Sequence, residues 1–198
     1  MDLDASHLFS GPAVRVVRAR PADAGRIGNF YLGLSRESRY ERFFSHRPEF
    51  AQEELHRLSH PDPSSELCMI ALAGEPGDEI VVGDARCVVG NSEAGPAISD
   101  GEIALVVADD WRRRGVGRAL MCGLIAAARH ERYDGLTAYI TATNAGMLTL
   151  IREFNFRAVA DGSGATVRLL RKEMRQIQYL VDPGCRAQPR EALAESAA

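Results

Sequence analysis

The residues with the clearest chemical potential lie between positions 102 and 120, where an apolar strand pattern runs into arginines and glycines. Arg112 precedes Gly115 and Gly117 in the spacing R-x-x-G-x-G, and a helical pattern begins at the first glycine. A helix start leaves backbone N–H groups without intrahelical partners and carries the positive end of the helix dipole. Glycine lets the backbone approach an anion without a Cβ in the way. The stretch predicts a phosphate site; an arginine-rich helix start that only turns the chain is the plainer alternative.

Two other phosphate-binding motifs can be tested on the same residues. A P-loop needs the pattern G-x-x-x-x-G-K-[ST], and no lysine follows these glycines. A dinucleotide-binding fingerprint needs a third small residue at the next turn of the helix, where this chain has Leu120. Neither motif therefore explains the stretch.

The R-x-x-G-x-G spacing resembles the acetyl-CoA pyrophosphate loop of the GNAT N-acetyltransferases, whose motif is [QR]-x-x-G-x-[GA]. A second family signature follows about thirty residues later, and Asn155 stands there in place of the usual glycine. The residues that match this second signature are Asn144, Met147, Leu150 and Phe156. The resemblance covers residues 14 to 172 approximately.

The resemblance implies an α/β fold with a mixed, mostly antiparallel sheet that is splayed between two strands and flanked by helices. It implies acetyl-CoA as co-substrate. His56 and His60 have a spacing that can bind a metal on one helix face, but Pro61 ends the helix there and no third ligand is evident, so we expect no metal. The N–H of Val107 would donate to the thioester carbonyl as it becomes an oxyanion. The cofactor-binding residues that it implies are Leu105, Val106, Val107, Arg112, Arg113, Arg114, Gly115, Val116, Gly117, Arg118 and Asn144.

Attack on a thioester requires a neutral amine, and lysine-type amines with a pKa of about 10.4 are mostly charged at neutral pH. A carboxylate can take that proton directly or through water. Because the family often places a glutamate at the start of the motif strand, Glu102 is the catalytic candidate. An exposed carboxylate at a strand end is the alternative, and Asp100, Asp109 and Asp110 are weaker candidates.

One position departs from the family. Many GNAT enzymes carry a tyrosine seven residues after the asparagine, and this chain has Ile151 there. Tyr133 and Tyr139 lie nearby in the sequence. Because a thiol pKa is only about 8.5, a thiolate can leave without a dedicated acid.

The segment 34–44 resembles the LSxESRYxRFF segment of bacterial Pat-type acetyltransferase domains, which modify protein lysines. The alternative is an amphipathic helix whose Tyr40, Phe43 and Phe44 fill the core. We therefore expect an acetyltransferase acting on a primary amine, with a protein lysine favoured over a small amine. The alternative from another class is a non-catalytic acyl-CoA-binding sensor.

The elements that must position these residues follow from the hydrophobic periodicity. We expect strands at 14–20, 67–73, 80–89, 102–108 and 136–141, helices at 21–34, 37–44, 49–58, 115–132 and 144–154, and two short strands within 156–171. The order is that of one mixed α/β domain at 14–175. An N-terminal arm at 1–13 and a C-terminal tail at 176–198 flank it.

Charge narrows the range of partners. The chain has 198 residues and a net charge of −3, which argues against a general nucleic-acid binder. Eleven acids and one base lie at 61–110, and six arginines and one acid at 111–132. The blocks suit a cationic acceptor and an anionic cofactor, or are simply solvated faces. An acidic start and no long apolar run indicate a cytosolic protein without membrane attachment, and a homodimer is left open.

Overall fold

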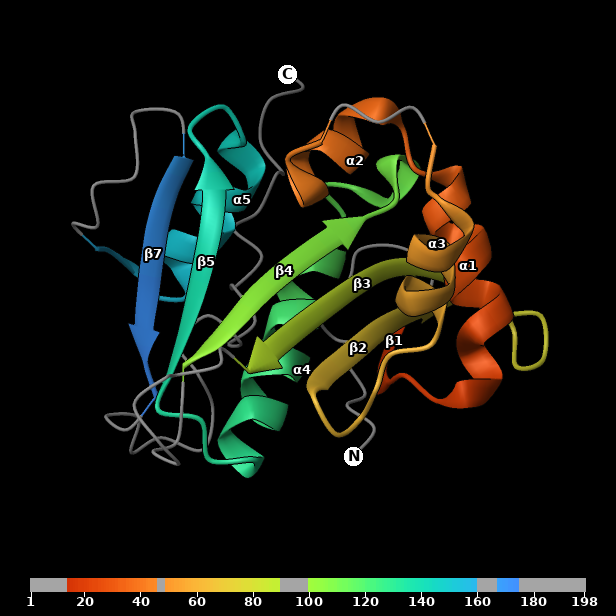
Figure 1. Ribbon diagram of the computed structural model, residues 1–198, viewed down its shortest axis with the longest axis horizontal. Coiled ribbons are helices and arrows are strands. Elements are labelled where there is room, and N and C mark those ends of the chain that lie inside the picture. The colour runs from red at the N-terminus through yellow and green to blue at the C-terminus, as the bar shows by residue number, and fades with distance from the viewer. Residues whose placement is uncertain (1–13, 46–48, 90–99, 160–166, 175–198) are drawn as a thin grey trace, which may run out of the picture.

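The structure is a computed structural model that describes residues 14–45, 49–89, 100–159 and 167–174 (Figure 1). The expected arm at 1–13, almost all of the polar loop at 90–101 and the expected tail at 176–198 lie outside the described residues. Within them, the order of helices and strands is the one that the hydrophobic pattern predicts, with ends that differ by a few residues. No helix in this part of the chain is both long enough and apolar enough to span a membrane.

The N-terminal half supplies one edge of the sheet and three helices. Its elements are β1 (Val14–Arg18), the 3-10 turn η2 (Pro21–Asp23), α1 (Ala24–Gly33), α2 (Arg36–Phe43), α3 (Gln52–Ser59), β2 (Glu66–Ala73) and β3 (Ile80–Val89). The C-terminal half contains β4 (Gly101–Val107), the 3-10 turn η3 (Asp109–Trp111), α4 (Val116–His130), β5 (Gly135–Thr141), α5 (Ala145–Glu153), β6 (Arg157–Ala158) and β7 (Val167–Glu173).

These strands form one seven-stranded sheet in the order β1-β2-β3-β4-β5-β7-β6. Every pairing is antiparallel except that of β4 with β5, which is parallel and is limited to Gly101 with Leu136 and Glu102 with Thr137. Beyond these pairs the two strands diverge (Figure 1). The expected mostly antiparallel sheet, splayed between two strands and flanked by helices, is confirmed.

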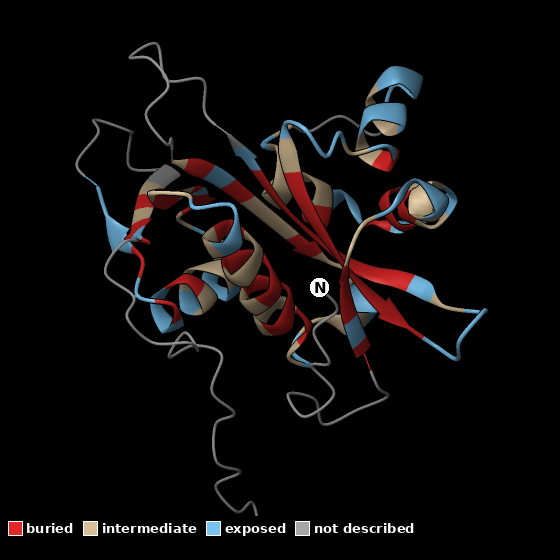
Figure 2. Cartoon of the chain, turned by 90° about the horizontal axis from the view of Figure 1, so that it is seen from below, coloured by how far each residue is buried: buried red, intermediate tan, exposed pale blue. Residues whose placement is uncertain are grey.

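Two apolar cores lie on opposite faces of the sheet. One packs α4 against the strands and includes Ile103 and Leu120, while the other lies under α1 and α3 and includes Val106 and Tyr31. Side chains alternate between the faces of a strand, so neighbouring residues of β4 contribute to different cores. Figure 2 shows buried residues along the strands and on the inner side of the helices.

The helix α2 ends in an unusual way. Its C-cap residue, Phe44, has a left-handed backbone with φ of 52°, and the Phe44 side chain is 42% exposed. Phe43 is half-buried and packs against the core that contains Tyr31. The expectation that Phe44 fills the core is wrong, because the left-handed turn at the helix end leaves its side chain at the surface.

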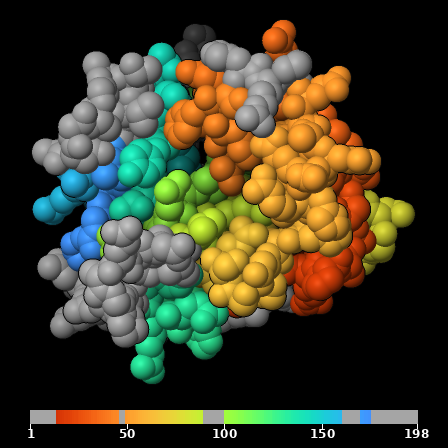
Figure 3. All heavy atoms as spheres, in the orientation of Figure 1, coloured from red at the N-terminus to blue at the C-terminus, as the bar shows by residue number. Residues whose placement is uncertain are grey.

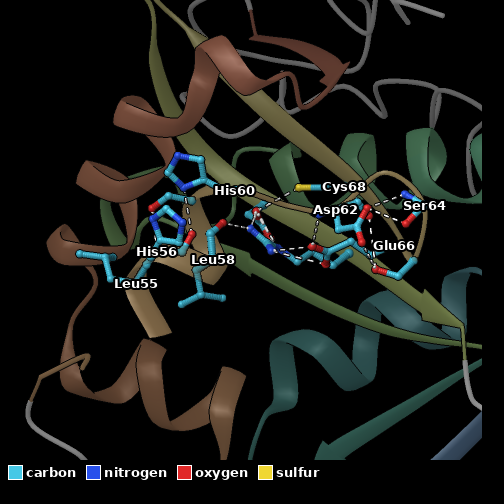
Figure 4. Close-up of polar contacts among 12 residues, drawn as sticks. Leu55, His56, Leu58, His60, Asp62, Ser64, Glu66 and Cys68 are labelled. Atoms are coloured by element: carbon cyan, nitrogen blue, oxygen red, sulfur yellow. Dashed lines mark hydrogen bonds and ion pairs between the residues drawn. The ribbon is translucent and has the colours of Figure 1, made fainter. Parts of the chain in front are cut away.

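A polar cluster is buried on the face of the sheet covered by α1 and α3. The Nε of Arg86 donates to Asp84 Oδ1 at 3.1 Å, and its Nη1 donates to Glu66 at 3.4 Å. Its Nη2 donates to the carbonyl of Leu58 near the end of α3, and the Cys68 thiol donates to Asp84. Figure 4 shows Leu58, Glu66 and Cys68 around this cluster. The cluster therefore fixes the end of α3 to the sheet.

Candidate active site

The gap between β4 and β5 exposes the backbone of alternate β4 residues. The N–H of Ala108 donates to the carbonyl of Val82 at 2.9 Å, which points it toward β3. Hydrogen-bonded and non-bonded pairs alternate in an antiparallel ladder, so the amide of Val106 also points toward β3, and those of Leu105 and Val107 point toward β5. Since β5 pairs only with the first two residues of β4, the Leu105 and Val107 amides face the gap.

A cavity of about 260 Å³ lies over this gap. In Figure 3 the β4 atoms lie in a hollow between α2 and the segment that contains β5 and α5. The cavity is lined from α2, β4, β5 and the start of α5 by Glu41, Arg42, Phe43, Phe44, Glu102, Ile103, Ala104, Leu105, Tyr139, Ile140, Asn144 and Met147. Of these residues, only Glu102, Leu105 and Asn144 are predicted site residues from the sequence, because nothing in the local pattern shows that α2 lines this cavity.

Glu102 lines this cavity and is exposed, as is Tyr139. It pairs with Val88 on one side and with Thr137 on the other, so it lies at the closed end of the gap. The thiol of Cys87, on the neighbouring strand, has a pKa raised to about 12 by its burial and, secondarily, by the negative charge of Glu102. The pairing of Glu102 thus places its carboxylate where β4 and β5 begin to diverge.

The loop before α4 has the backbone of an anion site. Gly115 is the N-cap of α4 with φ of 87°, and no side chain caps the helix there. Arg113 also has a left-handed φ of 61°. Because the first intrahelical bond joins the N–H of Ala119 to the carbonyl of Gly115, the amides of Val116 and Gly117 precede the hydrogen bonds of the helix.

Gly117 is not required by the protein's own packing. A Cβ built at this position would meet Leu150 at 3.5 Å, and Leu105 and Val107 at 3.8 Å, which are ordinary contacts. Its φ is not in the left-handed region. Since glycine weakens a helix by about 0.5–1 kcal/mol relative to alanine, its presence calls for a cause outside the fold. Close approach of an anion to the helix start is such a cause.

The four arginines of this loop lie in different surroundings. Arg112 donates to Ser38 Oγ at 2.7 Å and to Glu41 Oε2 at 3.1 Å, both on α2. Arg118 donates to Glu153 Oε2 of α5 at 2.5 Å. Arg114 lies over the ring of Trp111 at 5.3 Å, and Arg113 is exposed. Arg113 and Arg114 are the most exposed of the four.

Asn144 begins α5, and its Oδ1 accepts from the N–H of Met147 at 2.9 Å. It therefore holds the helix start beside the cavity that it lines. Ile151, at the family's tyrosine position, is fully buried in the core. Of the two nearby tyrosines, Tyr139 lines the cavity, whereas Tyr133 packs against Gly101 at the closed end of the gap.

His56 and His60 form a stacked pair with ring centroids 4.1 Å apart, near the end of α3. Among the described residues, no group of three or more histidine, cysteine, aspartate and glutamate side chains is arranged to hold a metal ion.

The comparisons with known proteins agree with this architecture. The sequence matches the acetyltransferase (GNAT) family over residues 34–156. An acetyltransferase of Pseudomonas aeruginosa is 27% identical over 159 residues, covering 80% of this chain and 83% of the relative. The GNAT domain of S. lividans PAT is similar in structure, with a TM-score of 0.73, 25% identity, and coverage of 87% of this chain and 96% of that one.

The structure of Salmonella typhimurium yncA with its cofactor acetyl-CoA matches with a TM-score of 0.62 at 18% identity, covering 81% of this chain and 94% of that one, which shows the shared fold. The chain belongs to the acetyltransferase (GNAT) family. It is an acyltransferase, and the reaction of its class moves an acetyl group from acetyl-CoA to an amine.

Proposed function

We propose that this chain acetylates lysine side chains of proteins, with Glu102 as the general base. The observation that carries the proposal is the arrangement at the β4–β5 gap. The amides of Leu105 and Val107 face the gap, and Glu102 lies in the cavity over the gap, on the side of α2. Cofactor and acceptor can therefore meet from two sides of the sheet.

The amides at the start of α4 and those of β4 that face the gap would bind different parts of acetyl-CoA. The amides of Val116, Gly117 and Arg118 at the start of α4 would hold the pyrophosphate, with Gly115 shaping the turn. The exposed Arg113 and Arg114 add positive charge nearby. The Leu105 and Val107 amides would pair with the pantetheine arm. Val106 takes no part through its amide, which points toward β3.

The chemistry follows from these positions. Glu102 accepts a proton from the ammonium group, and the neutral amine nitrogen then bonds to the acetyl carbon. The Val107 N–H donates to the carbonyl oxygen as negative charge develops on it. When the carbon–sulfur bond breaks, the thiolate keeps the electron pair, and the second proton on the amine nitrogen passes to this thiolate or to water. Because a thiol pKa is only about 8.5, a dedicated acid is unnecessary.

A protein acceptor is supported by the surface around the cavity. Phe44 and Tyr139 line it and are 42% and 43% exposed, and Val88, opposite Glu102 on β3, is 46% exposed. These side chains give the surroundings of the cavity apolar surface that a polypeptide acceptor could cover. The likeness of segment 34–44 to Pat-type domains, and of the fold to the GNAT domain of S. lividans PAT, point the same way.

The experiment combines a CoA-release assay with mass spectrometry of the acceptor. Lysine-containing peptides and proteins are compared with small amines at equal concentration, and we expect the polypeptides to be acetylated with the higher kcat/KM. Faster turnover of small amines would contradict the protein substrate. Binding of acetyl-CoA without CoA release across the whole panel would favour the sensor function.

The base is tested by Glu102→Gln, with Glu75→Gln in the exposed β2–β3 turn as the matched control. We expect Glu102→Gln to lower kcat by about a hundredfold or more while the acetyl-CoA Kd stays unchanged. The control should behave as the wild type. An unchanged rate and pH profile in Glu102→Gln would remove this residue from the role.

A further inference from the structure

The helix α2 is bound to the turn that leads into the anion loop. The carboxylate of Asp109 accepts from the Ser35 N–H at 3.1 Å, from Ser35 Oγ at 3.0 Å and from Ser38 Oγ at 2.6 Å. Arg112 donates to Ser38 Oγ at 2.7 Å and to Glu41 Oε2 at 3.1 Å. We call these five residues the α2 junction. It joins segments that are more than seventy positions apart in the sequence.

The hydroxyl of Ser38 lies at the centre of the junction and both donates and accepts a hydrogen bond, which favours one geometry. Ser38 is completely buried, and its single O–H donates to Asp109 while its oxygen accepts from Arg112. Burial alone would raise the pKa of Asp109, but the hydrogen bonds from Ser38 and Ser35 and the charge of Arg112 lower it. Charge-assisted hydrogen bonds of this kind are stronger than neutral ones and depend on geometry.

The two sides of the junction serve different ligands. Arg112 opens the R-x-x-G-x-G stretch whose later amides would hold the pyrophosphate, yet its guanidinium is engaged with α2. Glu41 belongs to the cavity wall, and the following residues to Phe44 line the same cavity. The side chain of Arg112 therefore connects the loop directly to the wall of this cavity.

We propose that Arg112 is a positioning residue for the acceptor, which couples the anion loop to α2 through Ser38 and Glu41. Binding of acetyl-CoA at the loop then fixes α2 as the cavity wall, and acceptor binding at α2 strengthens acetyl-CoA binding by the same factor, because coupling between two sites is reciprocal. The effect on the acceptor rests on the proposed function, whereas the coupling of the loop to α2 does not.

The coupling is tested without catalysis by amide hydrogen exchange. In the wild type, CoA should slow exchange in α2 as well as at the start of α4. In Arg112→Gln the α4 protection should persist and the α2 protection should be lost. Arg36→Gln, which removes an exposed arginine from the same helix, is the matched control and should retain both. Persistent α2 protection in Arg112→Gln would overturn the coupling.

The effect on the acceptor is tested by kinetics. Arg112→Gln and Ser38→Ala should each raise the acceptor KM by about tenfold, the loss expected for a hydrogen bond to a charged group, with little change in the acetyl-CoA Kd. The double variant should lose less than the sum of the two single losses, since both single substitutions remove the Arg112–Ser38 contact. Arg112→Lys, which keeps the charge without the planar guanidinium, should recover part of the loss and serves if Arg112→Gln does not fold.

Two outcomes distinguish the proposed coupling from direct cofactor binding by Arg112 and from failure of the proposed function. A raised acetyl-CoA Kd with an unchanged acceptor KM would mean that Arg112 binds the cofactor directly and would overturn the proposal. If no amine releases CoA from the wild type, the proposed function fails, and the exchange experiment still decides whether the loop and α2 are coupled.

Discussion

Two arginine-containing clusters of this molecule differ in what they leave open. The Arg86 side chain is 5% exposed and Asp84 is 0% exposed, and all three nitrogens of the guanidinium donate to acceptors within the chain. Around the α4 start, by contrast, the side chain of Arg112 is engaged but the backbone amides of Val116 and Gly117 precede the hydrogen bonds of the helix. The first cluster is closed by contacts within the chain, and the second region is the one that we propose binds a ligand.

The same contrast separates two glycines. A Cβ at Gly83 would lie 2.7 Å from Leu120 and 3.3 Å from the carbonyl of Val106, so glycine lets α4 pack against the sheet. A Cβ at Gly117 would make contacts no shorter than 3.5 Å. Packing inside the chain explains Gly83, whereas at Gly117 packing leaves room for a Cβ and we propose a bound anion as the cause.

The largest expected effect on the free energy of unfolding is at the buried cluster of Arg86 and Asp84. Arg86→Ala leaves the buried carboxylate of Asp84 without its cation, and removing one partner of a buried ion pair costs about 3–5 kcal/mol. Arg15→Ala, which breaks an ion pair with Glu79 from a 48% exposed arginine, should cost less than about 1 kcal/mol. Urea unfolding measures both free energies. A loss at Arg86 as small as that at Arg15 would contradict the assignment of this cluster to stability.

The two glycines should respond in opposite ways to alanine. Gly83→Ala should lower the free energy of unfolding by about 1–3 kcal/mol through overpacking. Gly117→Ala should leave it unchanged or raise it by up to about 1 kcal/mol, since alanine favours the helix. Only Gly117→Ala should weaken acetyl-CoA binding in the folded protein, by about tenfold or more in titration calorimetry. Wild-type affinity in Gly117→Ala would remove the loop from the binding site.

A further prediction concerns the closed end of the β4–β5 gap. At the closed end, burial and then Glu102 raise the pKa of the Cys87 thiol to about 12 from an ordinary 9.0. Since only the thiolate reacts, alkylation of Cys87 at pH 8 should be about a thousandfold slower than in urea. Peptide mapping after iodoacetamide treatment measures it, and rapid labelling at pH 8 would mean that this end is open.

The sequence was sufficient to predict the parts of the site that are local. The strand, the R-x-x-G-x-G spacing and the helix start are contiguous, so the open amides after Gly115 follow from the order of the elements. The placement of Asn144 at the start of a helix follows in the same way. These features depend on backbone rules that act within a few residues.

The remaining features depend on pairings between distant segments. Whether Leu105 or Val106 faces the gap is decided by the register with β3, which the sequence of β4 does not contain. The engagement of Arg112 by Ser38 requires that α2 lies across the loop. The only sequence signal for this position of α2 is the resemblance of segment 34–44 to Pat-type domains.

The central claim is that the amides left open by the chain are those that bind acetyl-CoA. Amide chemical-shift mapping of the labelled protein on titration with acetyl-CoA tests it most directly. We expect large shifts at Leu105, Val107 and Gly117, and small ones at Val106, which pairs with β3, and at Arg86, which lies within β3 between β2 and β4. Saturable binding that leaves Leu105, Val107 and Gly117 unshifted would contradict it.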